Sequence, residues 1–174
     1  MKPHFPVHEV SNGDLPQLER IGRLRLDVWR AETKVDEAQF EGGVWLEPLD
    51  YRARHWIATD GNVLIASGRL TMHATLEDNP DGYLWRRHER TVPLPAAHFC
   101  KLVVSSKARG MGLGREFNRV RIEAARGDGA KSILVTASDA NARLLLSMGF
   151  TDTGVVESFS NRPGFMFRAL QLVF

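Results

Sequence analysis

Hydrophobic positions recur along this chain with the spacing of helices in some segments and in short unbroken runs in others. Between residues 15 and 30 they lie three or four positions apart, and a second stripe of this kind begins at Leu113. A shorter helix is expected over residues 140–148, because Gly149 can end it. The two longer helices present the apolar faces Leu18, Ile21, Leu24, Val28 and Leu113, Phe117, Val120, Ala124.

Short apolar segments outside these helices predict β-strands. They are bounded by turn-forming residues, and Asp60-Gly61-Asn62 is typical of a hairpin between two of them. Residues 74–97, with Pro80, Pro93 and Pro95, are expected to form a long loop. The expected strands are residues 5–10, 55–59, 63–73, 99–104, 132–137, 154–158 and 165–174.

Composition sets limits on this outline. The chain has 174 residues, of which 43% are hydrophobic and 25% charged, so we expect a single domain over residues 1–174 with a sizeable core. The net charge of +2 is too small to predict nucleic-acid binding. No apolar run approaches the length of a membrane span, and no membrane partner is expected.

Cysteine use and the first residues favour a cytoplasmic location. Cys100 is the only cysteine, which excludes an internal disulfide and a cysteine-rich zinc site. No apolar stretch of signal-peptide length follows the opening Met-Lys-Pro-His-Phe-Pro. No metal site is expected, because no carboxylate or cysteine has ligand spacing with His4, His8, His55 or His88.

The segment from Leu102 to Arg115 carries the clearest functional pattern. An apolar run stops at Ser105, a basic glycine-rich turn follows, and a helix begins. Alternate glycines let the backbone approach a ligand closely, and the N–H groups at a helix start attract an anion. Flanking arginines add donors suited to phosphate oxygens. We therefore expect a pyrophosphate site formed by Arg109, Gly110, Met111, Gly112, Leu113, Gly114 and Arg115.

Three kinds of nucleotide loop share these features, and the spacing separates them. A P-loop would end in Gly-Lys-Ser/Thr, which is missing here. Phe117 occupies the third glycine position of a dinucleotide fingerprint, although Asp139 could imitate its ribose-binding acid. A dinucleotide domain also opens with its glycine loop, whereas this loop follows a hairpin, about two-thirds along the chain. Arg109-x-x-Gly112-x-Gly114 instead resembles the coenzyme A loop, Q/R-x-x-G-x-G/A, of the GNAT superfamily of acyl-CoA-dependent N-acetyltransferases.

The resemblance covers almost the whole chain. The expected order, β-α-α-β-β-β-α-β-α-β-β, is similar to that of the GNAT fold, which implies an α/β structure with a mixed, centrally splayed β-sheet and helices on both faces. Residues 138–150 resemble the family stretch N-x-x-A-x-x-L-Y-x-x-x-G-F, which closes the far side of the coenzyme channel. Ser138 and Asn141 take the asparagine and alanine positions and are assigned to coenzyme binding. Leu145 stands where many members place the tyrosine that protonates the departing thiolate.

The family also implies where the chemistry takes place. Its strand before the loop hydrogen-bonds the pantetheine and donates to the thioester carbonyl, roles that fall on the backbone of Leu102, Val103 and Val104. A base is needed, because an amine near neutral pH is mostly protonated. His98-Phe-Cys-Lys-Leu-Val-Val104 resembles the H-x-H-x-L-x-V strand of serotonin N-acetyltransferases, which makes His98 the candidate base. Secondary candidates are Cys100, His73 and Glu157.

The activity expected from this resemblance is transfer of an acetyl group from acetyl-CoA to a primary amine of a small molecule. The amine would attack directly in a ternary complex, in a monomer or homodimer. Two alternatives stay open. The missing tyrosine at Leu145 is compatible with a non-catalytic acyl-CoA-binding module. The other alternative is an N-acyltransferase similar to the acyl-homoserine-lactone synthases, which share the fold, on the basis of Arg25, Trp29, Glu47, Asp50 and Ser67-Gly68-Arg69-Leu70.

Overall fold

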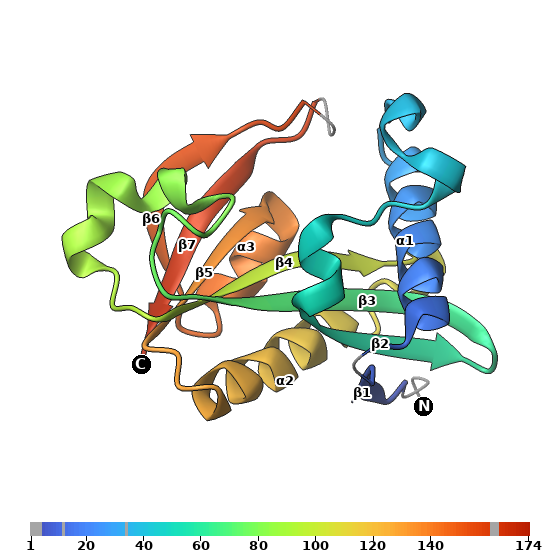
Figure 1. Cartoon of the computed structure of the whole chain (residues 1–174), viewed down its shortest axis with the longest axis horizontal. Coiled ribbons are helices and arrows are strands. Elements are labelled where there is room, and N and C mark those ends of the chain that lie inside the picture. Colours follow the sequence, from blue (N-terminus) through green and yellow to red (C-terminus); the bar gives the residue numbers. More distant parts are fainter. Residues whose placement is uncertain (1–4, 12, 34, 161–163) are drawn as a thin grey trace. The chain divides into compact units, whose positions relative to one another are not determined.

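This computed structural model describes residues 5–11, 13–33, 35–160 and 164–174, which contain seven strands, three α-helices and five 3-10 helices. Within these ranges no helix has the length and apolar character needed to cross a membrane. The strands form one mixed sheet in the order β1-β2-β3-β4-β5-β7-β6, which confirms the expected fold class. In chain order (Figure 1) the elements are β1 (Val7–Glu9), α1 (Leu15–Arg30), the 3-10 helices η1 (Glu37–Gln39), η2 (Glu41–Gly43) and η3 (Pro48–Arg52), β2 (Arg54–Asp60), β3 (Val63–His73), η4 (Gly82–Thr91), β4 (Ala96–Val104), η5 (Ser106–Ala108), α2 (Leu113–Gly127), β5 (Ser132–Ser138), α3 (Asp139–Leu146), β6 (Thr151–Glu157) and β7 (Phe167–Val173).

The chain groups into two compact units. The first unit contains the described residues of 1–69, 101–117 and 160–164, and the second contains those of 70–100, 118–159 and 165–174. β3, β4 and α2 each contribute residues to both units. The single domain over residues 1–174 stays a prediction.

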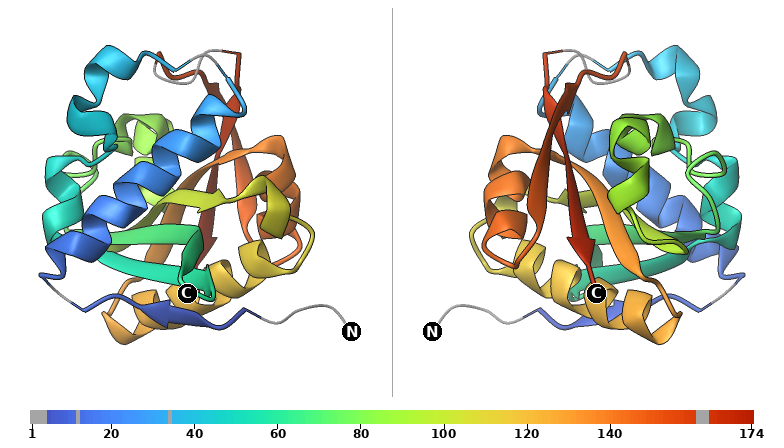
Figure 2. Two further views of the ribbon diagram at one scale, coloured as in Figure 1. Left: turned by 90° about the vertical axis from the view of Figure 1, so that its right-hand side faces the viewer. Right: turned by 90° about the vertical axis from the view of Figure 1, so that its left-hand side faces the viewer.

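In the first unit, α1 lies across β2 (Figures 1 and 2). The helix begins where the Asp14 side chain accepts a hydrogen bond from the backbone N–H of Gln17 at 3.0 Å, which satisfies one of its first donors. Leu18 and Ile21 on its apolar face pack against Ile57 of β2. The periodicity thus predicted this helix correctly, although Leu18 and Ile21 of its expected apolar face are buried while Leu24 and Val28 are only half-buried.

The structure differs from the expected order between α1 and β2. Instead of a second helix it has the three short 3-10 helices η1, η2 and η3. Gly42 and Gly43 have φ angles of +64° and +70°, which an α-helix cannot contain. These two residues therefore keep the segment in short turns.

In the second unit, β5 lies between a parallel and an antiparallel neighbour. β4 pairs with β5 in parallel from Ala96 opposite Ser132 to Phe99 opposite Val135, and β7 runs antiparallel to both β5 and β6. α3 packs against β5 and β7. Because neighbouring strand residues point to opposite faces, Phe99 meets Phe150 and His98 meets Trp85 of η4, with ring centroids 6.4 Å apart in both cases. η4 therefore contacts one face of β4, and Phe150, which follows α3, contacts the other.

Residues 74–97 are more ordered than the predicted loop. They contain the ten-residue helix η4, and β4 begins at Ala96. Leu84 and Trp85 of η4 are buried in a hydrophobic cluster with Leu134 of β5. The prolines suggested a loop, but this apolar face holds the segment on the core.

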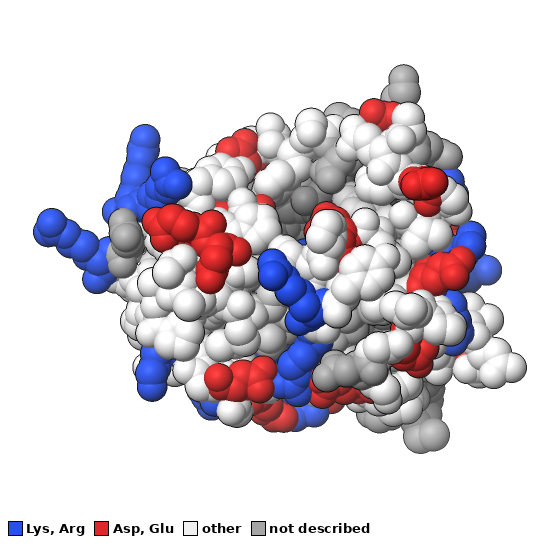
Figure 3. Space-filling view, viewed as in Figure 1, with Lys and Arg blue, Asp and Glu red and all other residues white. Residues whose placement is uncertain are grey.

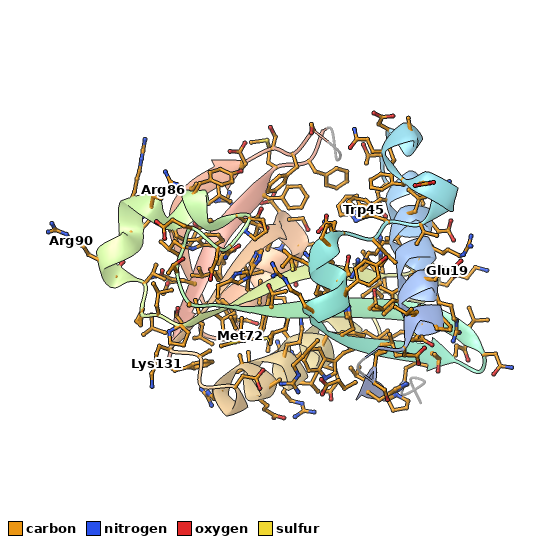
Figure 4. The ribbon with its side chains drawn as sticks, in the orientation of Figure 1. Glu19, Trp45, Met72, Arg86, Arg90 and Lys131 are labelled. Atoms are coloured by element: carbon orange, nitrogen blue, oxygen red, sulfur yellow. The ribbon has the colours of Figure 1, made fainter. Side chains whose placement is uncertain are left out.

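The outer side of η4 is basic. Arg86, Arg87 and Arg90 are exposed. Figure 4 shows Arg86 and Arg90 extending outward from the helix, and basic side chains gather over the same segment in the space-filling view (Figure 3). This run is a solvated helix face.

Candidate functional site

The glycine-rich turn between β4 and α2 presents a row of unbonded backbone N–H groups. Gly110 and Gly112 have φ angles of +74° and +85°, a conformation that favours glycine. The N–H groups of residues 110–114 have no hydrogen-bond acceptor in the described chain, whereas those of Arg115 and Glu116 donate to the carbonyl of Gly112. Five consecutive N–H groups without an acceptor at the start of a 15-residue helix are the kind of arrangement that backbone anion sites use.

Space beside this turn is open to a ligand. A Cβ added at Gly110 or Gly112 would meet no other atom within 4 Å, so nothing from the described chain packs there. The turn therefore fits an extended anion such as a pyrophosphate, which could approach the backbone directly.

The side chains of the predicted loop have different surroundings. The Nε of Arg109 donates to the carbonyl of Val104 at 3.3 Å, and its guanidinium pairs with Glu32 at 2.5 Å. Arg115 is exposed, and the Leu113 side chain is buried. Leu113 can therefore offer a ligand only its backbone N–H, whereas Arg109 is held along the turn.

The predicted residues Ser138 and Asn141 lie in the second unit, at the start of α3. Asn141 accepts a hydrogen bond from the side-chain amide of Asn118 at 3.4 Å, and Asn118 accepts one from Arg121 at 2.6 Å. Asn118 and Arg121 are buried on α2, and sequence reasoning missed both. Their signal was two polar residues three positions apart in an amphipathic helix.

Arg121 connects α2 to β4. Its guanidinium stacks on the Phe99 ring at 4.4 Å and donates to the carbonyl of Cys100 at 3.5 Å. Complete burial lowers the pKa of Arg121 to about 10, and Cys100 opposes that shift. The guanidinium is still a cation at neutral pH, so it contacts β4 as a charged hydrogen-bond donor.

Two buried histidines lie side by side in the second unit, each facing a carboxylate. His73 Nδ1 is 3.2 Å from Asp78 Oδ1, and His98 Nε2 is 3.4 Å from Asp81 Oδ2. Their ring centroids are 6.1 Å apart. Burial, followed by the charge of His98, lowers the pKa of His73, so His73 is neutral near pH 7. Sequence reasoning missed both aspartates, because they belong to the segment predicted as a loop.

The other two candidates in the second unit are less enclosed. Cys100 and Glu157 are both half-buried. The carboxylate of Glu157 accepts a hydrogen bond from the N–H of Ser158 at 2.8 Å. Burial, then the charges of Glu157 and Asp81, raise the pKa of Tyr83, so this phenol faces the same acidic groups.

A buried ion cluster occupies the first unit. Arg25 and Arg69 both bond Asp50 at 3.0 Å, and all three side chains are at least 97% buried. Burial favours a higher pKa for Asp50, but the charge of Arg25, then that of Arg69, outweighs it and lowers the pKa. Burial also lowers the pKa of His55, whose Nε2 is 2.9 Å from the Asp50 carbonyl oxygen. This cluster ties α1, η3 and β3 together by charge.

Glu47 and Lys101 extend this cluster to β4. Lys101 Nζ is 2.6 Å from Glu47 Oε1 and 4.8 Å from the centre of the Trp45 ring. Lys101 has a φ of +53°, a strained torsion for a residue with a side chain. These contacts stabilise the irregular backbone immediately before Leu102.

The pKa of Glu47 predicts how stability depends on pH. Burial favours a higher value, but Lys101 and Arg69 outweigh it and lower the pKa from 4.5 to about 2. A carboxyl whose pKa is depressed by folding stabilises the folded state fully above its unfolded pKa, and this contribution disappears as the pH falls through the folded pKa. We expect Glu47→Gln to be less stable than wild type at neutral pH, with a difference that shrinks between about pH 4.5 and pH 2. Urea unfolding of both proteins across this range measures it, and a pH-independent difference would contradict the assignment.

Comparison with known proteins identifies the relatives of this architecture. The model of the acetyltransferase (GNAT) family matches residues 18–150. None of the curated proteins matches the chain. Solved structures that resemble it include ElaA of Escherichia coli (16% identity, TM-score 0.66, covering 97% of this chain and 99% of that one). A second is FeeM, an N-acyl amino acid synthase from uncultured soil microbes (12% identity, TM-score 0.72, covering 98% of this chain and 90% of that one). A third is BjaI, a CoA-dependent acyl-homoserine lactone synthase (15% identity, TM-score 0.73, covering 98% of this chain and 83% of that one). At these identities the structural likeness concerns the fold.

Proposed function

Because the chain belongs to the acetyltransferase (GNAT) family and is an acyltransferase, we propose that it transfers an acetyl group from acetyl-CoA to the primary amine of a small molecule. The observation that supports this most strongly is the row of five unbonded N–H groups at residues 110–114. They suit the pyrophosphate of coenzyme A, and the open space beside Gly110 and Gly112 suits its close approach. Acyl-CoA is the donor in this family.

The proposed reaction is direct attack in a ternary complex. The neutral amine nitrogen forms a bond to the thioester carbonyl carbon, the C–S bond breaks, and its electron pair leaves with the sulfur. Negative charge that develops on the carbonyl oxygen is stabilised by backbone N–H groups of Leu102–Val104. The proton lost by the amine passes to a base on the enzyme, and the thiolate takes a proton from water. Leu145 is fully buried and has no acidic group, so it does not protonate the thiolate.

His98 is the proposed base, acting directly or through one water. It lies on β4, four residues before Leu102, so the strand that holds the acyl group also positions the imidazole. We expect His98→Gln, which keeps size and polarity but removes basicity, to lower kcat by about a hundredfold with little change in coenzyme affinity. Steady-state rates and calorimetry measure the two quantities. A variant with wild-type rate and pH profile would redirect the search to Glu157 and His73.

We propose that the two units act as one catalytic domain over residues 1–174. Support comes from β3, β4 and α2, each of which continues from one unit into the other without interruption. Separate unfolding of the two units would therefore require breaking two strands and a helix.

The activity itself is tested by turnover. Acetyl-CoA with a panel of small primary amines should release free thiol only when the acceptor is present, and mass spectrometry should show the acetylated amine. Thiol release at the same rate without an acceptor would mean hydrolysis and contradict the proposal.

A second candidate is transfer of a longer acyl group, as in N-acyl synthases. The observation that favours it is a cluster of ion pairs formed by Arg25, Glu47, Asp50 and Arg69. These four residues belong to the set on which the resemblance to the acyl-homoserine-lactone synthases rests. Proteins described as an N-acyl amino acid synthase and an acyl-homoserine lactone synthase share the fold. Long-chain acyl-CoA donors tested with homoserine lactone separate the two candidates, because each predicts a different preferred donor.

A further inference from the structure

His98 is a buried histidine whose nitrogens are unsatisfied by hydrogen bonds. Its side chain is only 2% exposed, and neither Nδ1 nor Nε2 has a hydrogen-bond partner within the described ranges. Buried polar groups are usually hydrogen-bonded, so such a group calls for a specific explanation. The nearest carboxylate is that of Asp81, whose Oδ2 lies 3.4 Å from Nε2, slightly beyond a good hydrogen bond.

Asp81 is held in this place by its own turn. Its backbone N–H donates to the side-chain oxygen of Asn79 at 3.0 Å, and its carbonyl accepts from the N–H of Leu84 at 3.0 Å. At Gly82 an added Cβ would lie 1.8 Å from the carbonyl oxygen of Leu76, so only glycine fits. Asn79 and Leu84 are buried and fasten the turn on both sides. The hydrogen-bonded turn around Asp81 therefore holds its carboxylate beside His98.

We propose that Asp81 is a positioning residue for His98, a role that rests on the proposed function of His98 as the base. Asp81 accepts a hydrogen bond from the Nε2–H group of the imidazole, which leaves the lone pair on Nδ1 to take the proton of the amine, directly or through one water. Once that proton has moved, the carboxylate stabilises the resulting imidazolium. Catalytic hydrogen bonds are often long without substrate and shorten in the complex. The 3.4 Å between His98 Nε2 and Asp81 Oδ2 would have to shorten in this way when substrate binds.

The other ionisable groups around this pair are compatible with the role. His73 faces His98 and is neutral near pH 7, so it does not repel the imidazolium. Asp78 is directed to His73 and not to His98. Tyr83 and, through it, Glu157 lie on the Asp81 side, and the raised pKa of Tyr83 keeps it neutral. Asp81 is therefore the carboxylate that acts on His98 within the second unit.

The kinetic test compares Asp81→Asn with Asp78→Asn. Both variants remove one charge from the same segment, but only Asp81 faces His98. The amide of the Asp81→Asn variant can donate to Nε2, which moves the ring proton to Nδ1 and blocks its lone pair. We expect kcat to fall roughly tenfold or more with KM for acyl-CoA unchanged, and the acidic limb of the kcat profile to move to lower pH. Asp78→Asn should keep the acidic limb of the kcat–pH profile at its wild-type position.

A spectroscopic test does not depend on turnover. The ¹⁵N NMR signals of the His98 imidazole are assigned by their loss in His98→Gln. In wild type they should show a protonated Nε2 and an unprotonated Nδ1. Asp81→Asn should reverse this tautomer, and Asp78→Asn should not. A wild-type Nδ1–H tautomer, or identical spectra in wild type and Asp81→Asn, overturns the inference. If His98→Gln lowers kcat while Asp81→Asn changes neither kcat nor the limb, the inference fails and the base role survives. If His98→Gln has no effect on rate, the base role fails instead.

Discussion

Replacing Gly112 by valine is expected to weaken coenzyme A binding by roughly a hundredfold or more. At φ +85° a β-branched residue is strained, so the turn would shift. The new side chain would also project into the open space beside the unbonded N–H groups of residues 110–114. Each hydrogen bond from an N–H to a charged phosphate contributes about 1.5–3 kcal/mol, so losing two of them gives this factor. Calorimetric titration with coenzyme A measures it.

Gly129→Val is the matched control for this experiment. Gly129 has a φ of +82°, is exposed, and has equally open space at its Cβ position, but it follows α2 at the opposite end from the turn. Both variants should therefore lose similar stability, about 1–3 kcal/mol, and only Gly112→Val should lose coenzyme affinity. Wild-type affinity in a folded Gly112→Val protein would remove the loop from the coenzyme site.

Replacing Asp50 by alanine is expected to destabilise the folded protein by about 3–5 kcal/mol. Asp50 is the counter-ion that Arg25 and Arg69 share, and its side chain is completely buried. Removing one partner of a buried ion pair leaves charges that water cannot reach, and the lost Coulomb energy is not regained. Asp50 also caps η3 by accepting the N–H of Glu47 at 2.7 Å. Urea or thermal unfolding reports the change.

Asp27→Ala provides the comparison for this substitution. Asp27 pairs with Arg30 at 3.2 Å, but the two side chains are 69% and 40% exposed. Exposed pairs contribute little, so this variant should stay within about 1 kcal/mol of wild type. Equal losses in the two variants would show that the Asp50 cluster has no special role in stability.

Most of the fold could be read from local patterns. The spacing of Leu18, Ile21 and their neighbours predicted α1, and Asp60-Gly61-Asn62 predicted the turn between β2 and β3. Both are short-range signals, which depend on residues close together in the sequence. The segment 74–97 was not readable, because its prolines indicate a loop while its contacts with the core, through Leu84 and Trp85, involve strands far away in sequence.

The candidate site likewise has a part that the sequence predicts and a part that it does not. The glycine turn was predictable, since its torsions and free N–H groups depend on residues that follow one another. The partners of His98 were not, because Asp81 reaches it from another segment, and nothing in the composition of residues 74–97 marks that carboxylate. Arg121 and Asn118 were hidden for a related reason, as polar residues buried on an otherwise amphipathic helix.

By itself the sequence determined the three α-helices, most of the strands, the glycine-rich turn at residues 109–115 and the resemblance that its spacing carries. All of these depend on local periodicity and on the torsions that glycine allows, which neighbouring residues decide. The tertiary structure alone decided which charges share a buried counter-ion, which carboxylate faces His98, and that η4 packs as part of the core. Those features depend on desolvation and on contacts between distant segments, and both exist only after the chain has folded.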